Sequence, residues 1–148
     1  MVISNLNTDR VLDLVRLIET YVEELRPFAE MSKAAFLSDK KNPPFVESYL
    51  RRGLEAVFDI GRHILPKVHG FRGIEYKTIA EELGNKGIVS KALAETIYET
   101  AGYRNRMVHF YREVSNEELY AIVKNNLDDF ERFNREITAF IRAYEARK

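Results

Sequence analysis

Arginines, an asparagine, a histidine and tyrosines stand close together in one segment, residues 103–111, which reads YRNRMVHFY. Histidine exchanges a proton near neutral pH, because its unperturbed pKa is about 6.5. Arginine forks onto a phosphate and offsets the charge that develops there during a displacement. His109, as general base or acid, and Arg104 therefore suit phosphoryl transfer on RNA without a metal, with the ribose 2′-OH attacking the adjacent phosphorus. Tyr111 can orient that phosphate or donate a hydrogen bond to it.

Arg104 falls on the inward side of the helix that the pattern predicts from about Ser90 toward Tyr111. The apolar stripe of this helix continues by steps of three and four to Arg104, Val108 and Tyr111, after starting at Leu93, Ile97 and Ala101. An unpaired buried guanidinium is costly, so we expect Arg104 to meet a carboxylate, backbone carbonyls or an anionic ligand.

His109 lies five positions after Arg104, which is about 140° around an ideal helix, so the two side chains do not share a face. To reach one phosphate, the helix must bend, with Gly102 as a candidate position, or a second copy of the chain must complete the site. The second alternative favours a symmetric dimer with a composite cleft. Asn105 is one helical turn before His109 and is a candidate for positioning it.

The surrounding sequence predicts an all-α fold, an up-and-down bundle of four long helices and one short one. Apolar residues at helical spacing define these helices, and Ser115 with Glu118 forms a capping-box pattern. The helix after Pro44 has two apolar faces, which suggests deep burial or a surface for a second copy. The predicted helices are 8–29 capped by Thr8 with Pro27 in the last turn, 45–65, 77–83, the helix after Ser90, and 115–141. Residues 38–44 and 66–73 are expected to be loops.

Composition agrees with one compact domain, residues 1–148, because 45% of the chain is hydrophobic and it has only 7 Gly and 4 Pro. The absence of Cys excludes a thiolate nucleophile and thiolate metal ligands. The 23 basic and 23 acidic side chains argue against holding nucleic acid by bulk charge, although residues 33–77 carry four more basic than acidic residues. Residues 1–13 resemble neither a secretory signal nor a membrane span, so we expect a cytoplasmic protein.

Two further sets of residues have less specific patterns. His63 and His69 are six positions apart without Cys or paired carboxylates nearby, which makes a poor metal site, so no metal or other cofactor is expected. The turn at 84–87 lacks the strand and the Lys-Ser/Thr ending of a P-loop, which argues against an autonomous nucleotide hydrolase.

The run from Arg104 to Tyr111 resembles the Arg-x4-His-x-Tyr motif of the HepT-like toxins, a branch of the HEPN superfamily of helical ribonucleases. The resemblance covers most of the chain from Phe45 onward, since residues 54–60, 80–89 and 115–141 are similar to the family's second helix, its short helix with the following turn, and its final helix. It implies a HEPN-like fold in which Arg104 and His109 are the catalytic pair and Tyr111 is the motif tyrosine.

The same resemblance implies a function and partners. It implies a metal-independent endoribonuclease toxin of a type II or type VII toxin–antitoxin pair, acting on RNA as a homodimer. A nucleotidyltransferase-fold (MNT) antitoxin would neutralise it, and adenylylation of Tyr111 is a hypothesis for how. The added phosphodiester would place an anion beside Arg104 and cancel its attraction for RNA.

Two other functions stay open. The same bundle can be a non-catalytic helical module that binds a nucleotide or docks a nucleotidyltransferase, with Arg104 as a phosphate ligand only. It can also be an assembly scaffold in which the motif forms an interface network.

The sequence also offers partners for a buried arginine: Asp59 or Glu55 is a candidate carboxylate for neutralising its charge.

Overall fold

A computed structural model describes residues 6–73, 75–108 and 114–147 of the chain. Over these ranges it contains seven α-helices and no strand, so the predicted all-α fold is confirmed. The helices are α1 (Thr8–Ala29), α2 (Lys33–Ser38), α3 (Asn42–His69), α4 (Tyr76–Asn85), α5 (Lys91–Met107), α6 (Asn116–Asn125) and α7 (Leu127–Ala146).

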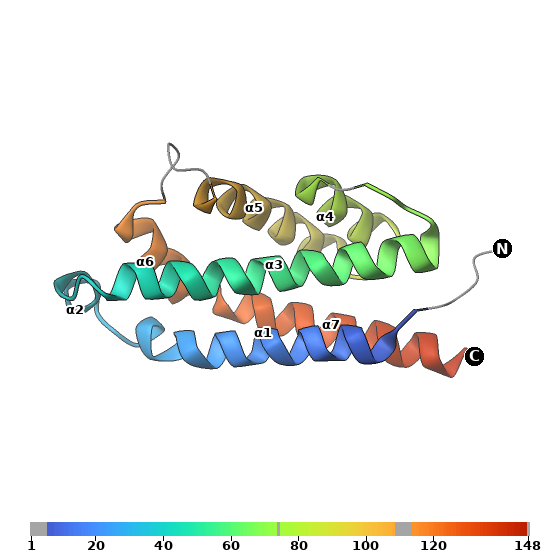
Figure 1. The fold of residues 1–148 in the computed structure, drawn as a ribbon, viewed down its shortest axis with the longest axis horizontal. Helices are drawn as coiled ribbons and strands as arrows, with labels where there is room; N and C mark the ends of the chain where they lie inside the picture. Colours follow the sequence, from blue (N-terminus) through green and yellow to red (C-terminus); the bar gives the residue numbers. More distant parts are fainter. Residues whose placement is uncertain (1–5, 74, 109–113, 148) are drawn as a thin grey trace.

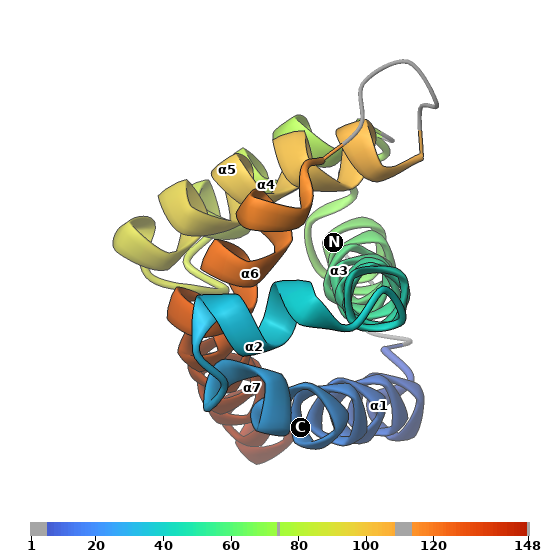
Figure 2. The ribbon, with the colours of Figure 1, turned by 90° about the vertical axis from the view of Figure 1, so that its left-hand side faces the viewer.

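The longest helix, α3, runs through the middle of the bundle (Figure 1). It packs against α1 on one side, and the pair α4 and α5 lies on its other side (Figure 2). Helix α7 packs along α1. Helix α1 begins and α7 ends at the same end of the bundle, whereas α5 ends and α6 begins at the opposite end (Figure 1). The last turn of α5, which carries the first part of the predicted functional segment, therefore lies toward the end of the bundle away from where α1 begins and α7 ends.

The apolar stripes predicted from the sequence form one core. The stripe that starts α5 is buried. In the last helix, Phe130 and Phe133 are buried and Phe140 packs against the core. The second apolar face of α3 is largely covered within the chain: Ala56 and Ile60 are buried, while Phe45 stays exposed. Deep burial, one of the two alternatives for this helix, thus describes most of that face.

Four of the helices, α1, α2, α5 and α6, start after a polar side chain that caps them. Ser90 accepts a hydrogen bond from the Leu93 amide, and Ser115 and Glu118 form the predicted capping box. The predicted cap of α1 is wrong by one residue. The side-chain oxygen of Asn7, rather than Thr8, accepts a hydrogen bond from the Arg10 amide, at 3.0 Å.

Helix α3 is longer than the sequence pattern predicted, because it begins at Asn42 and passes through Pro66 to His69. Pro66 lies in the last turns, where its missing N–H removes only one helical hydrogen bond. Gly70, with a φ of 69°, then ends the helix, and the amides of Gly70 and Phe71 bond to the carbonyls of Pro66 and Leu65.

Two short helices account for the difference between five predicted helices and seven observed ones. Helix α2 lies where no helix was predicted, and Ser32 caps it by accepting a hydrogen bond from the Ala35 amide at 3.1 Å. The predicted helix 115–141 divides at Asn126 into α6 and α7. The Asn126 side chain donates to the Asp129 side chain at 2.9 Å, beside this break.

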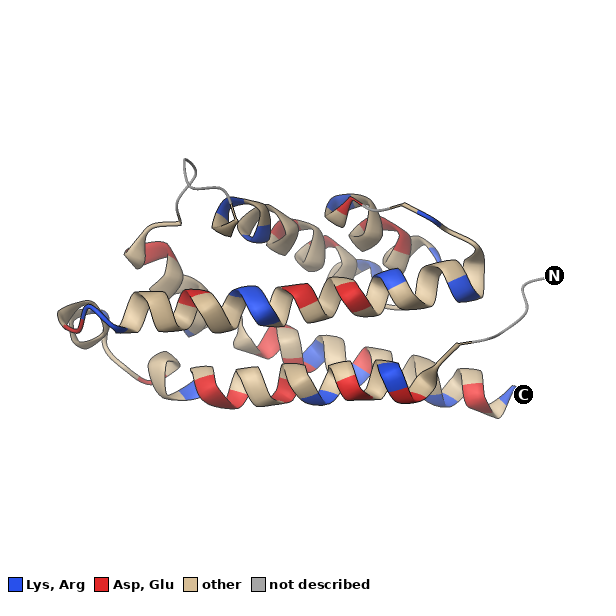
Figure 3. Cartoon of the chain, in the orientation of Figure 1, with Lys and Arg blue, Asp and Glu red and all other residues tan. Residues whose placement is uncertain are grey.

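Acidic and basic side chains are interspersed along α1 and α3 (Figure 3). The excess of basic residues at 33–77 therefore does not produce a uniformly basic α3. None of the helices built from the described residues has the length and hydropathy to cross a membrane.

Candidate functional site

Arg104 occupies the last turn of α5, and its side chain is 21% exposed. The predicted inward stripe thus includes Arg104, but its continuation to Val108 is wrong, since Val108 is 39% exposed. Helix α5 ends at Met107 instead of running to Tyr111, and it is uninterrupted at Gly102. Helix α5 thus ends after Arg104 and before His109 in the sequence, and a bend at Gly102 stays a prediction.

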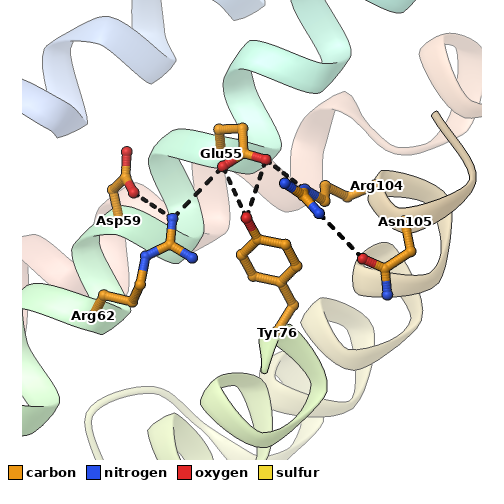
Figure 4. Close-up of polar contacts among 6 residues, drawn as sticks. All are labelled: Glu55, Asp59, Arg62, Tyr76, Arg104 and Asn105. Atoms are coloured by element: carbon orange, nitrogen blue, oxygen red, sulfur yellow. Dashed lines mark hydrogen bonds and ion pairs between the residues drawn. The ribbon is translucent and has the colours of Figure 1, made fainter. Parts of the chain in front are cut away.

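Glu55 of α3 is the carboxylate that meets Arg104. The Arg104 Nε group donates a hydrogen bond to Glu55 Oε1 (Figure 4). Asp59, the other predicted carboxylate, instead accepts from Arg62 Nη2 at 2.5 Å. These three residues of α3 share a face because they are four and three positions apart. Both carboxylates were thus predicted from the sequence. In the fold, Glu55 accepts a hydrogen bond from Arg104, and Asp59 accepts one from Arg62.

Tyr76, the first residue of α4, completes the contacts of Arg104 and was not singled out in the sequence. Its hydroxyl lies 3.1 and 3.3 Å from the two Glu55 carboxylate oxygens, so it donates to Glu55. The Arg104 Cζ atom lies 4.0 Å from the centroid of the Tyr76 ring, which is a cation–π contact. The ring also packs against buried Phe58, with centroids 4.7 Å apart. No short-range pattern marks Tyr76, because its partners come from α3 and α5.

Arg62 shares these partners. Its Nη2 atom lies 3.6 Å from Glu55 Oε2, and its Cζ atom lies 4.9 Å from the centroid of the Tyr76 ring. Burial is the largest single influence and lowers the pKa of Arg62, but the hydrogen bonds and charges of Asp59 and Tyr76 together outweigh it, so the pKa lies above its ordinary value. Glu55 lies between the guanidinium groups of Arg62 and Arg104 (Figure 4).

Asn105 contacts Arg104 through its side chain. Its Oδ1 atom accepts a hydrogen bond from Arg104 Nη1 at 3.3 Å (Figure 4). The predicted roles of His109 and Tyr111 fall on residues 109–113, which lie outside the described part of the chain. The positioning of His109 by Asn105 thus stays a prediction.

Arg106 and Glu118 join the two helices that flank residues 109–113. Two hydrogen bonds of 2.8 Å run from Arg106 Nη1 and Nη2 to the Glu118 carboxylate. Glu118 also accepts from the Ser115 amide at 3.2 Å. The hydrogen bonds from Arg106 and then from Ser115 lower the Glu118 pKa to about 2. The sequence identified Glu118 as part of a capping box, but not as the partner of Arg106.

The other histidines have separate surroundings. His63 Nε2 accepts a hydrogen bond from the Asn7 amide at 3.3 Å, and burial followed by the charge of Lys67 lowers the His63 pKa. Burial, followed by the charge of Lys86, also lowers the His69 pKa. Over the described ranges, no three His, Cys, Asp or Glu side chains gather into a metal-binding group.

The arrangement around Arg104 leaves donors for an anion. A guanidinium carries five N–H bonds, and hydrogen bonds to described residues use two of those of Arg104, at Nε and Nη1. The remaining N–H bonds can take phosphate oxygens. This site can hold a phosphate group next to the segment that carries His109.

Comparisons with known proteins agree with this chemistry. A model of the family described as Ribonuclease HepT-like matches residues 18–137. A protein named tRNA nuclease HepT, from Aphanizomenon flos-aquae (strain 2012/KM1/D3), is 27% identical over 127 residues, which are 86% of each chain.

Solved structures show the same fold. The tri-AMPylated HEPN toxin of Shewanella oneidensis, in complex with its MNT antitoxin, superposes with a TM-score of 0.79 at 22% identity, over 87% of this chain and 96% of that chain. The cytosolic protein YutE of Bacillus subtilis superposes with a TM-score of 0.81 at 13% identity, over 96% and 95% of the two chains.

Proposed function

This chain belongs to the HepT-like ribonuclease family, and on that premise we propose that it is an endoribonuclease that cleaves RNA without a metal ion. Arg104 and His109 are its catalytic pair. The observation that carries the proposal is the Arg104 guanidinium, which Glu55 and Tyr76 hold at the end of α5 with N–H bonds left for a phosphate. In the sequence, Arg104 lies five positions before His109.

The reaction is an internal displacement at phosphorus. His109 takes the proton of the ribose 2′-OH, and the 2′-oxygen attacks the adjacent phosphorus. The bond to the 5′-oxygen breaks, and that oxygen leaves with the proton that His109 returns to it. The products are a 2′,3′-cyclic phosphate and a 5′-hydroxyl. Arg104 binds the non-bridging oxygens, whose negative charge is greatest in the transition state.

The active form is a homodimer whose two motif segments line one cleft. Arg104 is five positions from His109, and α5 ends between them, so a cleft between two chains can bring an arginine and a histidine to the same phosphate. The partial exposure of Arg104 supports access for a substrate from outside the chain.

A nucleotidyltransferase-fold antitoxin neutralises the nuclease, as in a type II or type VII toxin–antitoxin pair. The Shewanella oneidensis neighbour, an AMPylated toxin held by an MNT antitoxin, supports this partner. Tyr111 is the acceptor: its hydroxyl oxygen attacks the α-phosphorus of ATP, pyrophosphate leaves, and the hydroxyl proton goes to solvent. The resulting phosphodiester occupies the place of the RNA phosphate near Arg104.

Cleavage in excess chelator tests the proposal. Transfer RNA is the first substrate to use, because a 27% identical relative is named a tRNA nuclease. Unmodified wild type is compared with His109→Ala, after both are shown to have equal helicity and equal mass in solution. Cleavage that needs His109 and no metal supports the proposal.

Two other results would support the other functions. A folded wild type that binds phosphate or a nucleotide and cleaves no RNA indicates the binding module. A His109→Ala protein that loses stability or its dimer, with no reaction to lose, indicates the scaffold.

A further inference from the structure

We infer that Glu55 and Tyr76 are positioning residues for the proposed ribonuclease reaction: they fix the Arg104 guanidinium so that its Nη groups are left for the substrate phosphate. The inference rests on the proposed function. It concerns residues from α3 and α4, which lie outside the Arg-x4-His-x-Tyr motif.

Glu55 fixes the direction of the guanidinium through its Nε edge. A hydrogen bond at Nε holds the plane of the group, because Nε is the atom that joins the guanidinium to the side chain. The carboxylate is itself held by the Tyr76 hydroxyl and lies 3.6 Å from Arg62. An acceptor with its own partners cannot swing freely, so it transmits a fixed orientation to Arg104.

The Tyr76 ring supports one flat face of the same guanidinium group. This ring lies 4.0 Å from Arg104 Cζ and packs against buried Phe58. The ring therefore connects the guanidinium to the core as well as to Glu55. Among the side chains, only tyrosine supplies both the flat aromatic surface and the hydroxyl.

Gly61 of α3 allows the helix that carries Tyr76 to come this close. A Cβ atom at Gly61 would lie 2.6 Å from the Ile79 Cγ2 atom of α4, which is nearer than such atoms approach. The bare backbone of Gly61 thus belongs to the same arrangement as the Tyr76 contact.

Positioning and inhibition by Glu55 predict opposite kinetics. If Glu55 only competed with RNA for Arg104, removing its charge would raise kcat/KM. If it orients Arg104, removing its charge lowers kcat by about 10-fold, because a transition-state contact is misplaced, while KM is unchanged or lower. A lower KM follows from the stronger net positive charge left at Arg104.

The first test measures kcat and KM for Glu55→Gln, Tyr76→Phe and Tyr76→Leu. We expect kcat to fall about 10-fold for Glu55→Gln, about 3-fold for Tyr76→Phe, which keeps the ring, and about 10-fold for Tyr76→Leu. Asp59→Asn is the matched control, since it removes a carboxylate one turn away that pairs with Arg62, and we expect kcat within 2-fold of wild type.

A double-mutant cycle gives the readout that a merely structural role would not move. In an Arg104→Ala background, Glu55→Gln has no further effect on kcat if it acts through Arg104. If Glu55→Gln lowers kcat by the same factor in the Arg104→Ala protein as in wild type, the inference is overturned. A rise in kcat/KM for Glu55→Gln alone also overturns it. In both cases the ribonuclease proposal stands.

A measurement without turnover completes the test. In a nitrogen-15 spectrum, the Arg104 Nε–H is expected to exchange slowly in wild type and Asp59→Asn, and at least 10-fold faster in Glu55→Gln. Equal exchange in all three proteins overturns the inference. If wild type cleaves no RNA, the proposed function fails and positioning for catalysis fails with it, whereas the Nε–H exchange still reports whether Glu55 holds Arg104.

Discussion

The Glu55 carboxylate and the Arg104 guanidinium are 49 residues apart in the sequence and hydrogen-bonded in the fold. The bond joins the middle of α3 to the last turn of α5, and Tyr76 of α4 contacts both residues. Residues of three helices, α3, α4 and α5, therefore determine the position of the Arg104 guanidinium. That cation lies at the start of the segment that carries the proposed histidine.

Replacing Arg104 tests whether the guanidinium shape matters beyond its charge. We expect Arg104→Ala to lower kcat by about 10²- to 10³-fold, the usual effect of removing a donor to the transition state. Arg104→Lys keeps the charge but lacks the Nε hydrogen bond and the fork, so it recovers little of the loss. Initial cleavage rates measure both. Arg16→Lys, on exposed α1, is the control, and a fully active Arg104→Lys protein would contradict the assigned role.

The ion pair of Arg106 and Glu118 gives stability that depends on pH. The folded-state pKa of Glu118 is depressed to about 2, so its contribution is present above the unfolded value near 4.5 and is lost as pH falls toward 2. Both side chains are 37% exposed, which limits the effect through solvent screening. Glu118→Gln should lower the melting temperature by about 2 °C at pH 7.

Thermal unfolding of Glu118→Gln and wild type from pH 7 to pH 2.5 checks this. The difference between the two melting temperatures should shrink as the pH falls. A difference that stays constant over the range would mean that the charge of Glu118 contributes nothing. Glu117→Gln, next to it on exposed α6, is the control for a changed net charge.

Two glycine substitutions in helix interiors should have opposite signs. Gly61→Ala puts a Cβ 2.6 Å from the Ile79 side chain, and we expect it to destabilise the fold by about 1 kcal/mol after the gain in helix propensity. Gly102→Ala meets no atom within 4 Å and should stabilise by about 0.5–1 kcal/mol. Urea unfolding gives both values. A destabilising effect of Gly102→Ala would indicate that the backbone at Gly102 needs a glycine, as the predicted bend requires.

Asn134 is a buried polar residue whose Oδ1 atom has no hydrogen-bond partner among the described residues. Its Nδ2 atom donates to the Val15 carbonyl at 3.3 Å. Leucine has a similar volume and lacks both the Oδ1 acceptor and the Nδ2 donor. Asn134→Leu removes the unsatisfied acceptor and should therefore stabilise the fold by about 1 kcal/mol. Urea unfolding measures it, and a loss of more than about 1 kcal/mol would show that the amide is needed.

The sequence predicted what repeats along a helix. The stripe from Leu93 to Ala101, the Ser90 cap and the capping box at Ser115 all depend on residues within one or two turns of each other, and the fold has them. The break at Asn126 was missed because the apolar stripe continues across it, from Leu119 and Ile122 to Leu127 and Phe130.

The site divides in the same way. Arg104 was found from its type and phase, and Glu55 was one of two candidate carboxylates. The choice between Glu55 and Asp59 depends on how α3 and α5 cross, which no local pattern encodes. Tyr76 was missed for the same reason, since the residues that it contacts all come from other helices: Glu55, Phe58, Arg62 and Arg104.

In the proposed reaction the RNA supplies its own nucleophile. The most direct measurement compares one RNA sequence with its 2′-O-methyl counterpart in excess chelator, and identifies the ends of the products. We predict that only the RNA is cut, leaving a 2′,3′-cyclic phosphate and a 5′-hydroxyl. Cleavage of the 2′-O-methyl strand, or cleavage that appears only when a divalent metal is restored, would contradict it.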